Sequence, residues 1–114
     1  MVIKNLTDVP IINLPGHDRV KKQIVIGPED GSQEIVLRYF SIEPGGTSPH
    51  HSHDFPHVVK IEAGKGAVTD ATGSEHQLQP GDYVYVDNND AHFFTNTGSE
   101  PFDFICIVPQ RGEA

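Results

Sequence analysis

The apolar residues of the chain fall in short runs that turn residues interrupt at fairly regular intervals. Pairs such as Gly27-Pro28 and Pro80-Gly81 mark these interruptions. No segment of helical length carries a sustained apolar stripe at the helical period. The segments between turns are rich in β-branched and aromatic residues, and we expect strands at 23–26, 34–43, 58–63, 83–86, 91–96 and 102–108. Many short strands at this spacing predict an all-β sandwich or barrel, with helix limited to a turn near Asp8 or in the tail.

Alternation along these strands separates an inward face from an outward face. The residues predicted to share the inward face are Val36, Arg38, Phe40, Ile42, His57, Val59, Ile61, His92, Phe94, Asn96, Phe102, Phe104, Cys106 and Val108. The segment 102–108 is apolar on both faces, so it needs a second cover as well as an interior. Around the predicted barrel, 21–109, we expect an N-terminal arm at 1–20 that contributes to the barrel or to a dimer, and a tail at 110–114, with fraying over 109–114.

Composition narrows the class of protein. The 114 residues suit a single domain, and 8 Lys+Arg against 16 Asp+Glu give a net charge of −8. This acidic balance argues against binding a nucleic-acid backbone, and no apolar run is long enough to span a membrane. Lys4, Asp8 and Pro10 break the N-terminal segment, so we expect no signal peptide. Cys106 is the single cysteine, which favours a reducing, cytoplasmic location.

Histidines supply the candidate chemistry, since the chain has seven and four of them lie within residues 50–57. His51 and His53 are two positions apart, so on a strand both imidazoles project from one face, whereas His50 points away. His57 and His92 lie on inward faces of other strands. Burying several basic groups without a partner is costly, and a divalent metal is the natural partner. We therefore predict that His51, His53, His57 and His92 hold one metal ion, and that His17, His50 and His76 are exposed.

Two stretches resemble the two motifs of the cupin superfamily. The first motif has a glycine, five residues, His-x-His, a short gap, a further ligand, six residues and a glycine, and its positions are filled by Gly45, His51, His53, His57 and Gly64. The second is matched by Gly81, Asp82, His92 and Asn96. The resemblance implies a double-stranded β-helix, a jelly-roll barrel with one metal inside. It also implies a homodimer, which would cover the second face of 102–108.

The chain departs from the motifs at three positions. His57 stands where the first motif usually has glutamate, so the chain looks most like small single-domain cupins with an all-histidine site. Asp87 and Asn89 stand where the second motif usually has proline and glycine. Asn tolerates positive φ better than other non-glycine residues, so we expect this turn to persist at Asn89.

The change from glutamate to histidine alters the charge of the expected site. Three imidazoles and one carboxylate leave a divalent ion at 2 − 1 = +1, whereas four neutral imidazoles leave it at +2. The site is then a stronger Lewis acid, and it favours nickel, copper, zinc and iron over manganese. We expect one divalent ion among these five metals, with two positions of an octahedral ion open to small molecules.

Three function classes follow. The first is a metal-dependent oxygenase, such as a dioxygenase, and the second is Lewis-acid chemistry such as isomerisation or decarboxylation. The third is a non-catalytic binding or sensing module with a structural metal. Arg38 is either a substrate-carboxylate anchor or a salt-bridged residue at the barrel mouth. The expected pocket walls are Phe40, Phe94, Phe104 and Cys106. Asn96 is expected to hold a ligand or a turn in place, and a small molecule is the expected partner.

Overall fold

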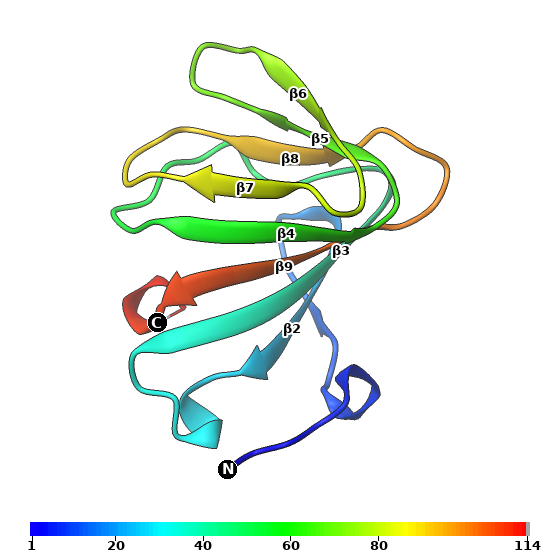
Figure 1. The fold of residues 1–114 in the computed structure, drawn as a ribbon. Helices are drawn as coiled ribbons and strands as arrows, with labels where there is room; N and C mark the ends of the chain where they lie inside the picture. The colour runs from blue at the N-terminus through cyan, green and yellow to red at the C-terminus, as the bar shows by residue number, and fades with distance from the viewer. Residues whose placement is uncertain (114) are drawn as a thin grey trace.

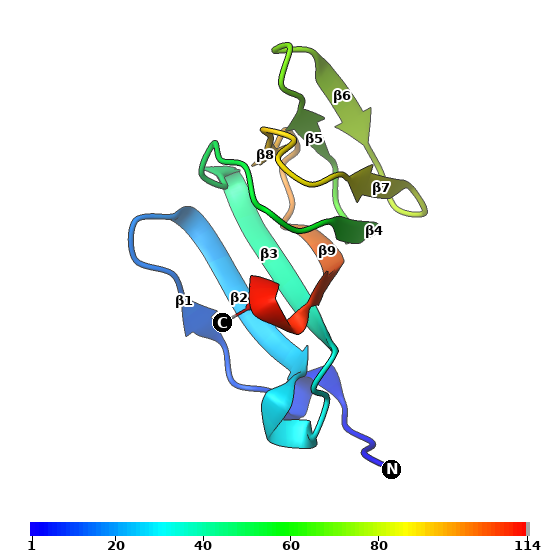
Figure 2. The same cartoon turned by 90° about the vertical axis from the view of Figure 1, so that its left-hand side faces the viewer.

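The computed structural model describes residues 1–113, which form one curled sheet with very little helix (Figures 1 and 2). The elements in chain order are η1 (Leu6–Asp8), β1 (Ile12–Asn13), β2 (Asp18–Ile26), η2 (Pro28–Asp30), β3 (Ile35–Thr47), β4 (His57–Ala63), β5 (Gly66–Thr69), β6 (Glu75–Leu78), β7 (Tyr83–Val86), β8 (Phe93–Asn96), β9 (Phe102–Pro109) and η3 (Gln110–Gly112), where η is a short 3₁₀ helix. The strand order is β6-β5-β8-β3-β9-β4-β7, with β2 paired to β3 and β1 to β2. The predicted all-β jelly-roll class is confirmed.

The core lies on the concave face of the sheet, where β3 and β9 are antiparallel neighbours. Their register sets Arg38 opposite Cys106 and Phe40 opposite Phe104. Directly opposed residues point to the same face, so both pairs face the interior. β9 alternates strictly between buried and half-buried positions, and its buried residues are Phe102, Phe104, Cys106 and Val108. The inward parity predicted for this strand is confirmed.

The opposite face of the same strands carries an apolar row. Leu37, Ile107, Val58 and Tyr85 are successive cross-strand partners on β3, β9, β4 and β7. Their neighbours of the other parity fill the core, so this row faces outward. Val58 is 46% exposed and Tyr85 is 64% exposed. The second apolar face predicted for 102–108 therefore extends over four strands.

The structure differs from the expected elements mainly at the edges. β2 begins at Asp18, inside the segment expected as an arm, while β1, β5 and β6 were not expected as strands. In the described part of the tail, Gln110 to Gly112 form η3, and Gly112 lies against the ring of Phe55. Sequence periodicity does not place these contacts. The fraying expected of the tail stays a prediction, and position 114 lies outside the described residues. Among the described residues, no helix is long and apolar enough to cross a bilayer.

Candidate metal centre

Two of the predicted ligands are placed by a backbone bridge between segments far apart in the sequence. The N–H of His51 donates to the carbonyl of His92 at 3.2 Å, and the N–H of His92 donates back to His51 at 3.0 Å. His51 follows the end of β3 and His92 precedes the start of β8. The ring centroids of the two imidazoles are 5.3 Å apart.

His53 is placed by the turn that precedes His92. Asn89 has a φ of +62°, and its N–H donates to the carbonyl of His53 at 2.6 Å. This is the position where the sequence replaces the usual glycine, and the predicted positive φ is confirmed. The rings of His51 and His53 lie 4.0 Å apart, although the segment between them is not a regular strand. The shared direction of these side chains therefore comes from the bridge and the turn rather than from strand alternation.

Three imidazoles converge closely enough to share an ion. Ligand nitrogens of His51, His53 and His92 lie within 4.8 Å of one another. Nitrogens bound to one zinc-like ion stand at most about 4.2 Å apart, so a small closing movement suffices. His57 is not among these three, but its ring lies 4.8 Å from that of His53 and 5.3 Å from that of His92. Its Nε2 is buried and has no hydrogen-bond partner.

The protonation state of these rings suits metal binding. Burial, together with neighbouring histidines, lowers the pKa of His51 to about 4. Burial, followed by charge repulsion from His53 and Arg38, lowers the pKa of His57 to about 3. Burial also lowers the pKa of His53. Nδ1 of His92 lies 2.7 Å from the Asp90 carbonyl, so Nδ1 carries the proton and the lone pair of Nε2 is available to a metal ion. Neutral imidazoles and an orphaned buried nitrogen fit a divalent transition metal.

The histidines open into a cavity of about 190 Å³ whose walls are mostly apolar. All four residues predicted as walls line it, namely Phe40, Phe94, Phe104 and Cys106. The Phe104 ring stacks on Phe40 at 5.4 Å and on Phe94 at 4.9 Å, which makes a continuous aromatic side. Burial raises the pKa of Cys106, so its side chain is a neutral thiol at neutral pH.

Asn96, expected to support either a ligand or a turn, is buried away from the cavity lining. Its amide donates to the carbonyls of Ile42 at 2.8 Å and Glu100 at 2.7 Å. Its side-chain oxygen accepts from the N–H of Gly98 at 2.8 Å. These three bonds tie the turn after β8 to β3, and none of them goes to a histidine. Of the two expected roles, the geometry matches that of holding a turn.

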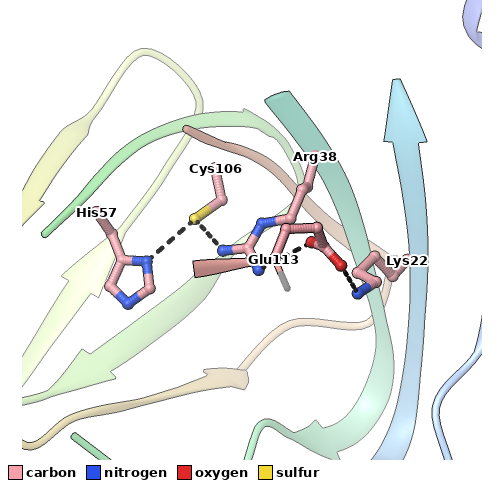
Figure 3. Close-up of polar contacts among 5 residues, drawn as sticks. All are labelled: Lys22, Arg38, His57, Cys106 and Glu113. Carbon is pink, nitrogen blue, oxygen red and sulfur yellow. Dashed lines mark hydrogen bonds and ion pairs between the residues drawn. The ribbon is translucent and has the colours of Figure 1, made fainter. Parts of the chain in front are cut away.

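Arg38 lines the cavity. It belongs to a chain of polar contacts that runs from His57 to Lys22 (Figure 3). Its Nη2 donates to Cys106 Sγ at 3.0 Å, and this sulfur is 3.6 Å from Nδ1 of His57. Its Nη1 faces the carboxylate of Glu113 at 3.4 Å, and that carboxylate accepts from Lys22 at 2.7 Å. The salt-bridge reading of Arg38 is therefore realised, and the bridge lies against the histidine cavity.

Sequence reasoning missed several residues at this site, and four of them bear on its chemistry. Lys22, Phe55 and His17 also line the cavity, and Glu113 closes the polar chain. Phe55 stacks on His53 with ring centroids 4.7 Å apart and planes 14° apart. The expectation that His17 is exposed was wrong: it is half-buried, and its Nδ1 is buried without a partner.

The reasons for these omissions differ. Lys22 shares strand parity with the inward Val20, a signal that was lost because the strand was expected to begin at 23. No periodic pattern marks His17, which lies in the turn between β1 and β2. His50 and His76 are exposed, as predicted.

Comparison with known proteins relates the chain to a family. Residues 38–108 match a family model described as a cupin domain. The polyketide cyclase RemF from Streptomyces resistomycificus has a TM-score of 0.90 at 23% identity, over 96% of this chain and 80% of that one. A cupin 2 domain-containing protein from Halorhodospira halophila has a TM-score of 0.75 at 31% identity, over 80% of this chain and 64% of that one. Auxin-binding protein 1 from Arabidopsis thaliana is 24% identical over 94% of this chain, which spans 58% of that relative's length.

Proposed function

The chain belongs to the cupin family, and on that premise we propose that it uses one divalent transition metal for chemistry on a small organic molecule. The proposed ligands are His51, His53, His57 and His92. The observation that carries the proposal is the convergence of three imidazoles within 4.8 Å, inside a cavity with apolar walls. The orphaned Nε2 of His57 supports this residue as the fourth ligand.

The side chains around the ligands have separable roles in this proposal. The Asp90 carbonyl accepts from Nδ1 of His92, which leaves Nε2 of His92 free for the metal. Nδ1 of His57 lies 3.6 Å from the Cys106 sulfur, so Nε2 of His57 is the nitrogen proposed for the metal. The rings of Phe40, Phe94 and Phe104 exclude water and receive the apolar part of the substrate. A bound metal would supply Lewis-acid polarisation of a substrate oxygen and, if redox-active, electron transfer.

Two reaction classes remain proposals, oxygenation and non-redox isomerisation or decarboxylation. The absence of a carboxylate among the proposed ligands supports iron, nickel, copper or zinc as the resident ion over manganese. Activity with zinc in place of a redox-active metal would favour the non-redox class. Oxygen uptake above that of His51→Ala with iron, manganese or copper would favour the oxygenase class.

The first test is the metal content of variants purified and then loaded with zinc under identical conditions. We expect one zinc per chain in the wild-type protein and at least about tenfold weaker zinc binding in His51→Ala, because one of the converging nitrogens is lost. His50→Ala is the matched control, because the imidazole of His50 is exposed and adjacent in sequence to His51. This variant should bind zinc like the wild-type protein. Equal zinc binding by the two variants would contradict the proposed centre.

Metal binding alone does not separate an enzyme from a ligand-binding module. A thermal-shift screen of the metal-loaded protein against small organic molecules should identify compounds that bind. Each such compound is then incubated with the loaded protein, and its conversion is followed. Stabilisation without conversion would favour the non-catalytic module, whereas conversion that His51→Ala abolishes supports the enzyme.

We also propose a homodimer in a reducing, cytoplasmic setting. The outward row of Leu37, Ile107, Val58 and Tyr85 supports a second copy as the cover of this face. The single cysteine, Cys106, is a free and buried thiol, which supports a reducing location.

A further inference from the structure

We propose that Lys22 and Arg38 form a carboxylate-binding subsite beside the histidines, that Glu113 fills this subsite as a built-in ligand, and that the substrate is a small carboxylic acid that replaces it. The inference deepens the proposed function, because it names the class of substrate for the same cavity. It rests on the proposed function only in placing the reacting end of that substrate toward the histidines.

The carboxylate of Glu113 lies between two cations. Its Oε2 accepts from Lys22 Nζ at 2.7 Å, and its Oε1 lies 3.4 Å from Arg38 Nη1 (Figure 3). The side chains of Lys22, Arg38 and Glu113 are only 15%, 11% and 12% exposed. A carboxylate held by two nearly buried cations marks the position as a site for that group.

Arg38 keeps unused capacity for an anion. A guanidinium has five N–H donors in a planar fork. In this structure one faces Glu113 at the long distance of 3.4 Å and one donates to the Cys106 sulfur, which is a weak acceptor. Nε is buried and has no hydrogen-bond partner within residues 1–113. A buried cation satisfied this poorly gains from an oxygen ligand inside the cavity.

The charges around the cavity are unbalanced in favour of an anion. Lys22 and Arg38 line it, and no Asp or Glu does so among the described residues. Glu113 instead lines a second hollow of about 600 Å³ next to the N-terminal segment, while its carboxylate contacts the two cations that line the first. Glu113 therefore offsets the two cations from outside the histidine cavity, and a substrate carboxylate would approach them from inside it.

The segment that carries Glu113 is held by few hydrogen bonds. Gln110 N–H donates to the Glu34 carbonyl at 2.9 Å, and Arg111 reaches the Asp54 carbonyl at 3.5 Å. Within the described part of the chain, Glu113 itself makes hydrogen bonds to the two cations and donates its N–H to the Gln110 carbonyl at 3.0 Å. Replacing its carboxylate thus requires rearrangement of one short turn and leaves the sheet intact.

The volume of the cavity selects the probe. A cavity of about 150 Å³ in another protein takes up benzene, so about 190 Å³ suits a single-ring acid. Benzoate carries one carboxylate on an apolar ring that matches the phenylalanine walls. Benzamide has the same shape without the charge.

The test is a calorimetric titration of the full chain at pH 7 with benzoate and with benzamide, on metal-free and on zinc-loaded protein. We expect benzoate to bind in both states and benzamide to bind at least about tenfold more weakly, because the cations select the charge. Glu113→Gln should bind benzoate about tenfold more tightly, since the competing carboxylate is gone. Lys22→Gln should bind it about tenfold more weakly.

Matched controls separate the subsite from general electrostatics. Lys21, next to Lys22 on β2, forms an exposed ion pair with Glu43 of β3, and the distance from Nζ to Oε1 is 3.4 Å. Glu43→Gln makes the same change in net charge as Glu113→Gln and should leave benzoate affinity unchanged. Arg38→Lys keeps the positive charge and is the control for Arg38→Gln, which removes it. Circular dichroism checks that each variant is folded. If Arg38→Gln fails to fold, Lys22→Gln decides the question.

The outcomes distinguish this inference from the proposed function. Unchanged or weaker benzoate binding by Glu113→Gln overturns the role of Glu113 as a built-in ligand. Benzoate binding that needs zinc and survives both Lys22→Gln and Arg38→Gln overturns the subsite and leaves the metal centre standing. If the protein binds no metal but binds benzoate, and Lys22→Gln weakens that binding, the proposed metal-dependent function is overturned and the carboxylate subsite stands.

Discussion

A single backbone torsion angle bears directly on the metal centre. The positive φ of Asn89 aims its N–H at the His53 carbonyl, so the position of one proposed ligand depends on a turn between β7 and β8. Non-glycine residues rarely adopt this conformation, and Asn does so more readily than β-branched residues. The sequence predicted this turn because Asn89 occupies the place of the motif's usual glycine.

Substitutions at Asn89 should therefore change stability and metal affinity together. We expect Asn89→Gly to keep both, whereas Asn89→Val should lower the free energy of unfolding by about 1–3 kcal/mol. Asn89→Val should also weaken zinc binding, because the anchor of the His53 carbonyl is distorted. Urea denaturation and competitive zinc titration measure the two effects. Asn88→Val, at the adjacent exposed position without a positive φ, is the control; equal losses in both valine variants would refute the argument.

The orientation of individual side chains was predicted correctly where a motif or an expected strand covered the residue. His57, Phe104 and Cys106 were assigned inward faces from alternation alone, and all three are buried. Parity would have placed Lys22 on the inward face if the strand had been expected to begin earlier. Its contact with Glu113 could not be predicted, because it joins positions 22 and 113 and no local pattern encodes it. Tertiary contacts of the tail decide this part of the site.

Among the elements, β3 and β9 are joined by side chains as well as by their backbones. On the outward face, the hydroxyl of Tyr39 donates to Asp103 at 2.8 Å and that of Ser41 donates at 2.7 Å. Burial, followed by this carboxylate, raises the pKa of Tyr39 well above its ordinary value. The folded protein therefore keeps Tyr39 neutral at pH values where an unfolded chain ionises it.

This shift predicts a loss of stability at high pH. Below about pH 10, Tyr39 is neutral in both states; above it, the unfolded state releases the proton and the folded state does not, so the free energy of unfolding falls as pH rises. Urea denaturation at pH 8 and pH 10.5 should show this fall, and Tyr39→Phe should reduce it. An absorbance titration of native protein should show one of the three tyrosines resisting ionisation. Ionisation of all three together would contradict the assignment.

The elements that were not expected share a physical character. β5 and β6 have four residues each, and the exposed Glu75, His76 and Gln77 give β6 no apolar alternation. β5 is buried at Gly66, Ala67 and Val68, so it is too uniformly apolar and small to show a period of two. Their pairing with each other and of β5 with β8 defines them as strands. Strands with a clear alternation or β-branched and aromatic residues were therefore predictable, β7 among them, whereas β5 and β6 are defined by their partners.

On the scale of the whole molecule, the outward apolar row predicts self-association. Leu37, Ile107, Val58 and Tyr85 cross four strands, and each copy carries a net charge of −8. We expect a dimer that tightens as salt screens the repulsion between the two acidic copies. Light scattering after size exclusion should give twice the 12.5 kDa chain mass.

A charge in the middle of this row should separate the copies. Val58→Lys places an ammonium group among apolar neighbours and should shift the protein to the monomer. Gln77→Lys adds the same charge on β6, at the other end of the strand order, and should leave the dimer intact. A monomeric wild-type protein at high salt would rule out this interface.

The reciprocal bridge between His51 and His92 also bears on chain entropy. These residues are 92 − 51 = 41 positions apart, and joining the ends of such a loop costs an unfolded chain about 4 kcal/mol. Backbone hydrogen bonds close that loop through protein contacts alone. An ion that enters then joins segments that are already neighbours, so its binding energy is not consumed in ordering the chain. A chelator should consequently strip the metal and leave the barrel folded, which makes the centre exchangeable within the lifetime of one folded molecule.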